Sequence, residues 1–156
     1  PFAAPSAAEF YHLDTAAGPV EFSAVSIGNP HAVIRVRDVT PAPVDSVGPA
    51  VENHPRFPRR VNVGFLEIVA PDHVRLRVFE RGVGETRACG TGACAAVAIG
   101  RRHGPLVEEV SVDVPGGRMI VRWPGPGEPI WLTGPAETAF AGQVDVTGAK
   151  SPESSR

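Results

Sequence analysis

The sequence predicts an α+β fold in which a strongly curved, barrel-like mixed β-sheet surrounds one central apolar helix. First, 17 glycines and 17 prolines in 156 residues separate short runs, a distribution typical of strand-rich chains. Second, these runs are rich in β-branched residues, and several alternate apolar and polar side chains. Third, Thr91–Arg102 reads as a helix that is small and apolar on almost every side, so it must be covered all round.

Period-two alternation and β-branched content predict seven strands. The clearest is VRLRVFER, in which Val74, Leu76 and Val78 share one face and arginines occupy much of the other. Pro115-Gly116-Gly117 predicts a tight hairpin turn between two of the strands. The seven predicted strands are Val20–Ile27, His31–Arg37, Asn62–Val69, Val74–Arg81, Val110–Val114, Arg118–Trp123 and Ile130–Thr133.

Two segments are predicted to be helices. Thr91–Arg102 ends with basic residues that suit a helix C-terminus, followed by Gly104-Pro105, which stops it. Val44–Asn53 lies between prolines, so we expect a short helix at best, interrupted at Gly48-Pro49.

Composition narrows the classes of function. A net charge of -2 leaves no broad cationic surface, so nucleic acid is not expected as a partner. The longest apolar runs, such as Ala93–Gly100, are too short to cross a membrane, and with no leader visible the chain is expected to be cytoplasmic.

Lys150 is the only lysine, which argues against pyridoxal-phosphate catalysis, and no cofactor is expected. Two cysteines are too few for a disulfide framework or a four-cysteine zinc site, and no metal site is predicted.

The segment with the clearest chemical signal is Glu80–Ala95, ERGVGETRACGTGACA. Cys89 stands between a strand and the apolar helix, where unpaired N–H groups and the helix dipole favour a thiolate. It is therefore a candidate base or nucleophile, and the amides around Gly90 and Thr91 are candidates to hold a carboxylate. The alternative is a buried structural cysteine. Cys94, on the apolar helix, is interpreted as a packing residue.

Five further polar residues stand at strand ends. Glu80 and Arg81 precede the glycine-rich loop and are candidates to face a ligand, with a surface ion pair as the alternative. Asn29 and His31 lie in a turn between two predicted strands, and Asn62 begins another. From the residues alone, each of these has a structural alternative.

Taken together, the motifs resemble a known family. The segments GNPHAV, NVGFLEIV, ERGVGETRACGTGACA, VPGG and WLTGPA occur in the order and spacing of the C-terminal half of bacterial diaminopimelate epimerase. The resemblance runs from about Pro1 to Val146, and it implies one lobe of a two-lobe fold.

The resemblance also implies roles for individual residues. Cys89 matches the second catalytic cysteine, and His31 and Glu80 match residues that assist proton transfer. The positions that match substrate-binding residues are Asn29, Asn62, Arg81, Gly90 and Thr91. The implied reaction converts LL- to meso-diaminopimelate without a cofactor, for lysine and peptidoglycan precursor synthesis. One cysteine removes the α-proton while another returns a proton on the opposite face.

The sequence departs from the family in one large respect. The family's other half carries the first catalytic cysteine, and nothing here matches it, so the chain alone is expected to be inactive. The implied division is a catalytic lobe over residues 1–137, a final strand over 138–147 that packs on the missing N-terminal lobe, and a polar tail over 148–156.

Two other functions are alternatives. A proline racemase-like enzyme shares the Cys-Gly-Thr-Gly loop, but its preceding residues differ from Gly84–Ala88. A lone lobe is otherwise a non-catalytic binding or assembly module. The implied partners are a small-molecule substrate and the missing lobe, and a homodimer is left open.

Overall fold

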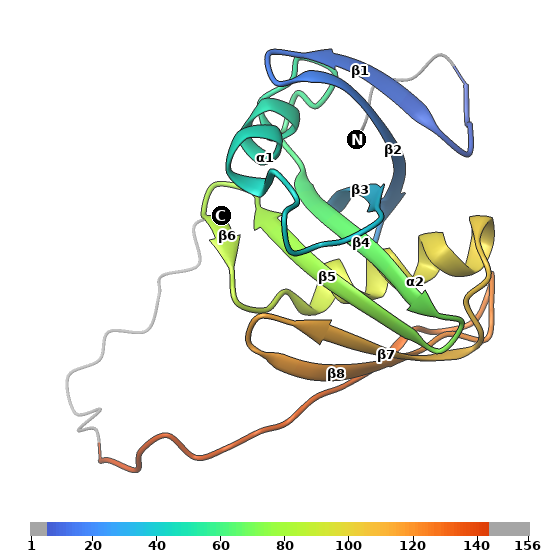
Figure 1. The fold of residues 1–156 in the computed structure, drawn as a ribbon. Coiled ribbons are helices and arrows are strands. Elements are labelled where there is room, and N and C mark those ends of the chain that lie inside the picture. The colour runs from blue at the N-terminus through green and yellow to red at the C-terminus, as the bar shows by residue number, and fades with distance from the viewer. Residues whose placement is uncertain (1–5, 144–156) are drawn as a thin grey trace, which may run out of the picture.

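The computed structural model describes residues 6–143, which form an α+β structure dominated by one mixed sheet (Figure 1). Its two helices are α1 (Val44–Glu52) and α2 (Gly90–His103). The strands are β1 (Tyr11–Thr15), β2 (Gly18–Ser26), β3 (Pro30–Val36), β4 (Asn62–Ala70), β5 (His73–Glu80), β6 (Gly84–Thr86), β7 (Glu109–Val114), β8 (Gly117–Arg122) and β9 (Trp131–Thr133). Neither helix is long and apolar enough to cross a membrane, within the residues described.

The strand order is β1-β2-β3-β4-β5-β7-β8-β9, with the short β6 paired to β5. The pairs β3–β4 and β5–β7 are parallel and the others antiparallel, so the sheet is mixed, as predicted. The parallel register of β3 and β4 sets His31 opposite Asn62. It therefore brings two candidate residues, 31 positions apart in sequence, to the same end of adjacent strands.

Each helix has its own core, on opposite faces of the sheet. In β4, Val63 and Phe65 belong to the core around α1, and Leu66 belongs to the core around α2. This division follows from the alternation of side chains along a strand. The residues of α2 from Gly92 to Gly100 are all buried. The sequence prediction of a surrounded apolar helix is therefore confirmed.

The predicted barrel-like closure is wrong for the described residues, because the sheet is open and its terminal strands β1 and β9 do not pair. The two ends serve different cores. In β1 and β2, Leu13, Val20 and Phe22 pack in the α1 core. At the other end, the side chain of Leu132 in β9 lies beside Gly90, at the start of α2. Because the strands at the two ends of the sheet pack in different cores, they do not pair with each other to form a barrel.

All seven predicted strands and both helices are present, with end differences of a few residues. The predicted interruption of α1 is wrong, since the helix continues through Gly48 and Pro49. Gly48 lies directly against the ring of Phe79, and a Cβ atom there would come within 2.6 Å of that ring. β1 and the three-residue β6 are strands that the sequence analysis missed.

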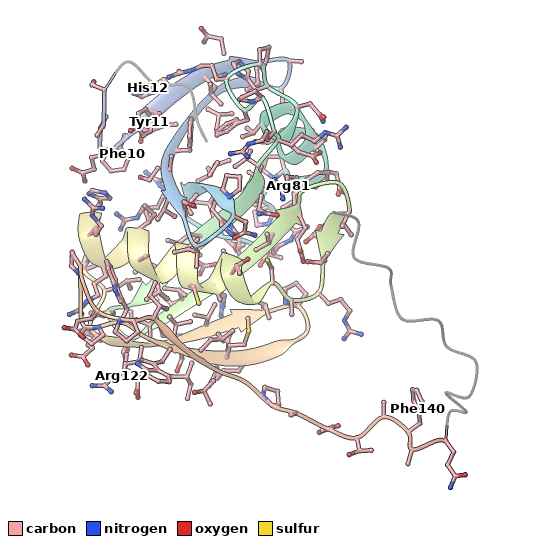
Figure 2. The ribbon with its side chains drawn as sticks, turned by 180° about the vertical axis from the view of Figure 1, so that it is seen from behind. Phe10, Tyr11, His12, Arg81, Arg122 and Phe140 are labelled. Atoms are coloured by element: carbon pink, nitrogen blue, oxygen red, sulfur yellow. The ribbon has the colours of Figure 1, made fainter. Side chains whose placement is uncertain are left out.

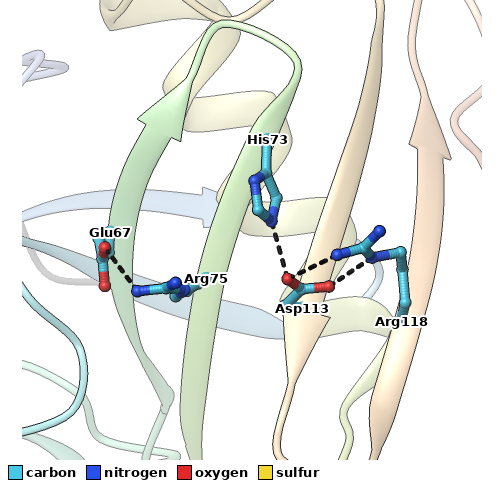
Figure 3. A network of polar contacts seen from close by, with 5 residues as sticks. All are labelled: Glu67, His73, Arg75, Asp113 and Arg118. Atoms are coloured by element: carbon cyan, nitrogen blue, oxygen red, sulfur yellow. Dashed lines mark hydrogen bonds and ion pairs between the residues drawn. The ribbon is translucent and has the colours of Figure 1, made fainter.

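A network of charged side chains crosses the strands β4, β5, β7 and β8 (Figure 3). Asp113 accepts hydrogen bonds from Arg118 and contacts His73 Nε2 at 2.8 Å. These contacts, with that of Arg118 the largest, lower the pKa of Asp113 to about 2. Arg75 Nη1 lies 3.3 Å from Glu67 Oε1 on the neighbouring strand. The contact of His73 with Asp113 links β5 to β7, which are otherwise joined over only three residue pairs.

Residues 134–143, which follow β9, contain no helix or strand, and Phe140 is 87% exposed. The predicted final strand, 138–147, falls partly on this segment, and its positions 144–147 lie outside the described residues, as does the predicted tail 148–156. The packing of 138–147 on another lobe therefore stays a prediction.

Candidate active site

Cys89 is the N-cap residue of α2, in agreement with its predicted place between a strand and the apolar helix. Its Sγ accepts a hydrogen bond from the backbone N–H of Gly92 at 3.4 Å and lies 3.7 Å from the Thr91 hydroxyl oxygen. A Cβ atom on Gly92 would lie 3.2 Å from this sulfur and 3.0 Å from Val78 Cγ2. The second glycine of the Cys-Gly-Thr-Gly motif therefore lets the sulfur and the first helical turn approach closely.

A chain of side-chain contacts leads from Cys89 to β3. The Asn29 amide Nδ2 donates to the Thr91 hydroxyl at 3.3 Å, and Asn29 Oδ1 lies 3.0 Å from His31 Nε2. Because an amide oxygen only accepts hydrogen bonds, the imidazole donates from Nε2. The turn 28–31 and the start of α2 are thereby joined across 62 residues of sequence.

Asn62 joins the first residue of β3, Pro30, to Arg81, the residue that follows β5. Its Nδ2 donates to the Pro30 carbonyl and its Oδ1 accepts from the backbone N–H of Arg81, both at 3.0 Å. Arg81 Nη1 in turn donates to the Arg59 carbonyl at 3.2 Å. Figure 2 shows Arg81 on the same side of the molecule as the N-terminal end of α2.

Glu80, the last residue of β5, accepts a hydrogen bond from the Thr86 hydroxyl of β6. Its negative charge also raises the pKa of the Cys89 thiol. Within residues 6–143, the ion pairs do not include one between Glu80 and Arg81. The surface-pair alternative is therefore wrong for these two residues.

Burial raises the pKa of the Cys89 thiol, and the charge of Glu80 acts in the same direction. The hydrogen bonds from Gly92 and Thr91 lower it, but they are outweighed. The thiolate predicted from the helix N-terminus is not favoured, because burial outweighs that effect and keeps Cys89 protonated near neutral pH. Cys89 in this state is a proton donor.

His31 is 2% exposed, and its pKa is lowered to about 4, first by burial and then by the charge of Arg81. It is therefore neutral at pH 7. A neutral imidazole with its proton on Nε2 orients Asn29 and, through Asn29, the Thr91 hydroxyl beside the sulfur.

The structure brings together candidate residues from four places in the sequence: residues 29–31, Asn62, Arg81 and residues 89–91. Sequence reasoning missed Thr86, although it stands in the same ERGVGETRACGTGACA string. Both cysteines are free, and no cluster of three His, Cys, Asp or Glu side chains suitable for a metal ion occurs in the described part of the chain.

Comparison with known proteins gives the family. The family model for diaminopimelate epimerase matches residues 23–139, so the chain belongs to the diaminopimelate epimerase family. It is 60% identical over 144 residues to the diaminopimelate epimerase of Alkalilimnicola ehrlichii, covering 92% of this chain and 52% of that protein. It is 57% identical over 146 residues to that of Halorhodospira halophila, covering 94% and 51%.

The chain thus spans about half the length of the curated relatives it matches. A solved structure of a phenazine biosynthesis protein of the PhzF family from Enterococcus faecalis covers 73% of this chain and 39% of its own. Its TM-score is 0.49 at 17% identity, a likeness that gives no information on function.

Cys89 should be alkylated faster than Cys94. Burial raises the pKa of both thiols, but the Gly92 N–H and the Thr91 hydroxyl stabilise the thiolate of Cys89. Iodoacetamide labelling from pH 7 to 10, located by mass spectrometry, measures both rates. The midpoint of the labelling rate of Cys89 against pH should lie above the ordinary cysteine pKa of about 8.5. It should rise further in Thr91→Val but not in Thr91→Ser. Faster labelling of Cys94, or a Cys89 midpoint below that value, would contradict this electrostatic account.

His31 should make stability depend on pH. The unfolded chain takes up a proton near pH 6.5 and the folded chain only near pH 4, so the stabilisation is complete above pH 6.5 and is lost as pH falls to about 4. Relative to His31→Gln, the wild type should lose about 3 kcal/mol between pH 7 and pH 4. Urea unfolding at each pH measures the difference. Exposed His12, as His12→Gln, is the control, and parallel profiles for wild type and His31→Gln would refute the prediction.

Proposed function

We propose that this chain supplies one face of the active site of a diaminopimelate epimerase, with Cys89 as one of two proton-transfer groups. The observation that carries the proposal is the continuous set of contacts from Cys89 through Thr91 and Asn29 to His31. Family membership supports the same conclusion, as does the name of each curated relative reported above.

The protonation of Cys89 defines its step in the reaction. A base on the opposite face, supplied by a second half, removes the α-proton, and the Cys89 S–H donates its proton to the carbanion from this side. The S–H bond breaks as the new C–H bond forms, so one group gains a proton and the other loses one. The resulting Cys89 thiolate is stabilised by the Gly92 N–H and the Thr91 hydroxyl. In the reverse direction this thiolate is the base.

The substrate's α-carboxylate is expected at the N-terminus of α2, where the Gly90 and Thr91 amides suit an anion. Negative charge develops next to this carboxylate as the proton leaves, so hydrogen-bond donors there stabilise the transition state. Arg81 and the two asparagines, Asn29 and Asn62, are the candidate groups for the substrate's other polar atoms.

No step in this scheme uses a cofactor. The proposed product, meso-diaminopimelate, is used in the cytoplasm for the synthesis of lysine and peptidoglycan precursors. The negative charge of Glu80 favours the protonated state of Cys89, and the thiolate left after each transfer takes a proton from solvent. Packing of the chain against a second half would place the opposing base.

A chimera tests the proposed function. The half of the Alkalilimnicola ehrlichii relative that this chain does not cover is joined to this chain, and conversion of LL- to meso-diaminopimelate is assayed in D2O. Inverted product carrying α-deuterium is expected. Cys89→Ser should reduce turnover by about 10³-fold, within the range expected for loss of an acid or base, while Cys94→Ser should retain most of it. A fully active Cys89→Ser chimera would refute the role of Cys89.

The 156-residue chain alone serves as the matched control for the chimera. With one proton-transfer group, it should give no inverted product under the same conditions. Steady inversion by the chain alone would contradict the two-base scheme.

A further inference from the structure

Glu52 is a buried acidic residue that the proposed reaction does not use. It is the last residue of α1 and is 5% exposed. Its Oε1 accepts the backbone N–H of Gly82 at 2.6 Å and lies 3.7 Å from Arg60 Nη1. A carboxylate at a helix C-terminus is unfavourable to the helix dipole, and burial of its charge is costly without partners. Within the end of α1, Glu52 has one long contact, from Asn53 Nδ2 to Oε2 at 3.4 Å, so its short hydrogen bond is the one with Gly82.

The partner of Glu52 is the turn that carries two candidate site residues. This turn follows β5 and joins Glu80 and Arg81 to Gly82, which has a φ of +74°. Two successive N–H groups of the turn are bound by side chains from other elements. Asn62 accepts from Arg81, and Glu52 accepts from Gly82. The turn is thus held from two directions, by β4 and by α1.

Glu52 also faces the segment against which the Arg81 side chain lies. Arg60, its ion-pair partner, has a φ of 57°, a conformation uncommon for a residue other than glycine. The carbonyl of the preceding Arg59 accepts a hydrogen bond from Arg81 Nη1. Glu52 therefore has two links to Arg81. It binds the N–H of Gly82, the next residue in the chain, and it pairs with Arg60, which follows the residue whose carbonyl holds the Arg81 guanidinium.

We propose that Glu52 is a positioning residue, which fixes the turn at Arg81–Gly82 so that Glu80 and Arg81 face the substrate. The proposal deepens the proposed function and rests on it for the identity of the substrate. Glu52 acts through the turn and touches none of the reacting atoms.

Hydrogen exchange at the turn tests the positioning without any assay of activity. In Glu52→Ala, exchange at the Gly82 amide should rise about tenfold or more, since a hydrogen bond to a charged acceptor is lost. Glu52→Gln keeps an oxygen acceptor, and its exchange should stay within about threefold of the wild type. Val51→Ala, at a fully buried neighbour on α1, controls for general loosening of the helix. Equal exchange at Gly82 in Glu52→Ala and Val51→Ala would overturn the proposal.

The kinetic test uses the chimera described above. Glu52→Ala should raise KM for diaminopimelate about tenfold, because Arg81 is released, and Glu52→Gln should restore most of the affinity. Val51→Ala should leave KM near the wild-type value, and an equal rise in KM would overturn the positioning role. If the Gly82 exchange changes as expected but the wild-type chimera does not act on diaminopimelate, the proposed function fails and the structural role of Glu52 in the turn stands.

Discussion

The nine consecutive buried residues of α2, Gly92–Gly100, impose the main constraint on this structure. A helix with no polar face in this stretch needs cover on all sides, and the strands β2–β5 and β7–β9 supply it. The N-terminus of this helix lies at Cys89. Because packing holds this helix on all sides, its first turn keeps the Cys89 sulfur in contact with the Gly92 N–H and the Thr91 hydroxyl.

Much of the fold was predictable because the signals were local. Alternation in VRLRVFER and the small apolar residues of α2 identify their elements from a few neighbouring positions. The open sheet was not predictable, because it depends on which core each end of the sheet serves. The continuity of α1 was missed for a similar reason: Gly48 and Pro49 look like a helix break until the ring of Phe79 is placed against the glycine.

The candidate site was predictable as a set of residues and not as a network. Motif and family resemblance selected Asn29, His31 and Cys89, but no sequence rule joins residues 62 positions apart through hydrogen bonds. The pKa of Cys89 shows the limit of local reasoning most clearly. A helix N-terminus favours a thiolate, whereas burial by strands distant in sequence reverses the result. The support from Glu52 has no sequence signature, since it depends on a turn 30 residues away.

In the proposed reaction, the start of α2 presents residue 89 to the substrate's α-carbon, and the adjacent amides hold the α-carboxylate. A crystal structure of the Cys89→Ser chimera with bound diaminopimelate measures this directly. The side-chain oxygen at position 89 should lie within roughly 3–3.5 Å of the α-carbon, a near-attack distance, with the α-carboxylate at the N–H groups of Gly90 and Thr91. A ligand bound away from the start of α2, or a carboxylate on the far side of Asn29, would contradict it.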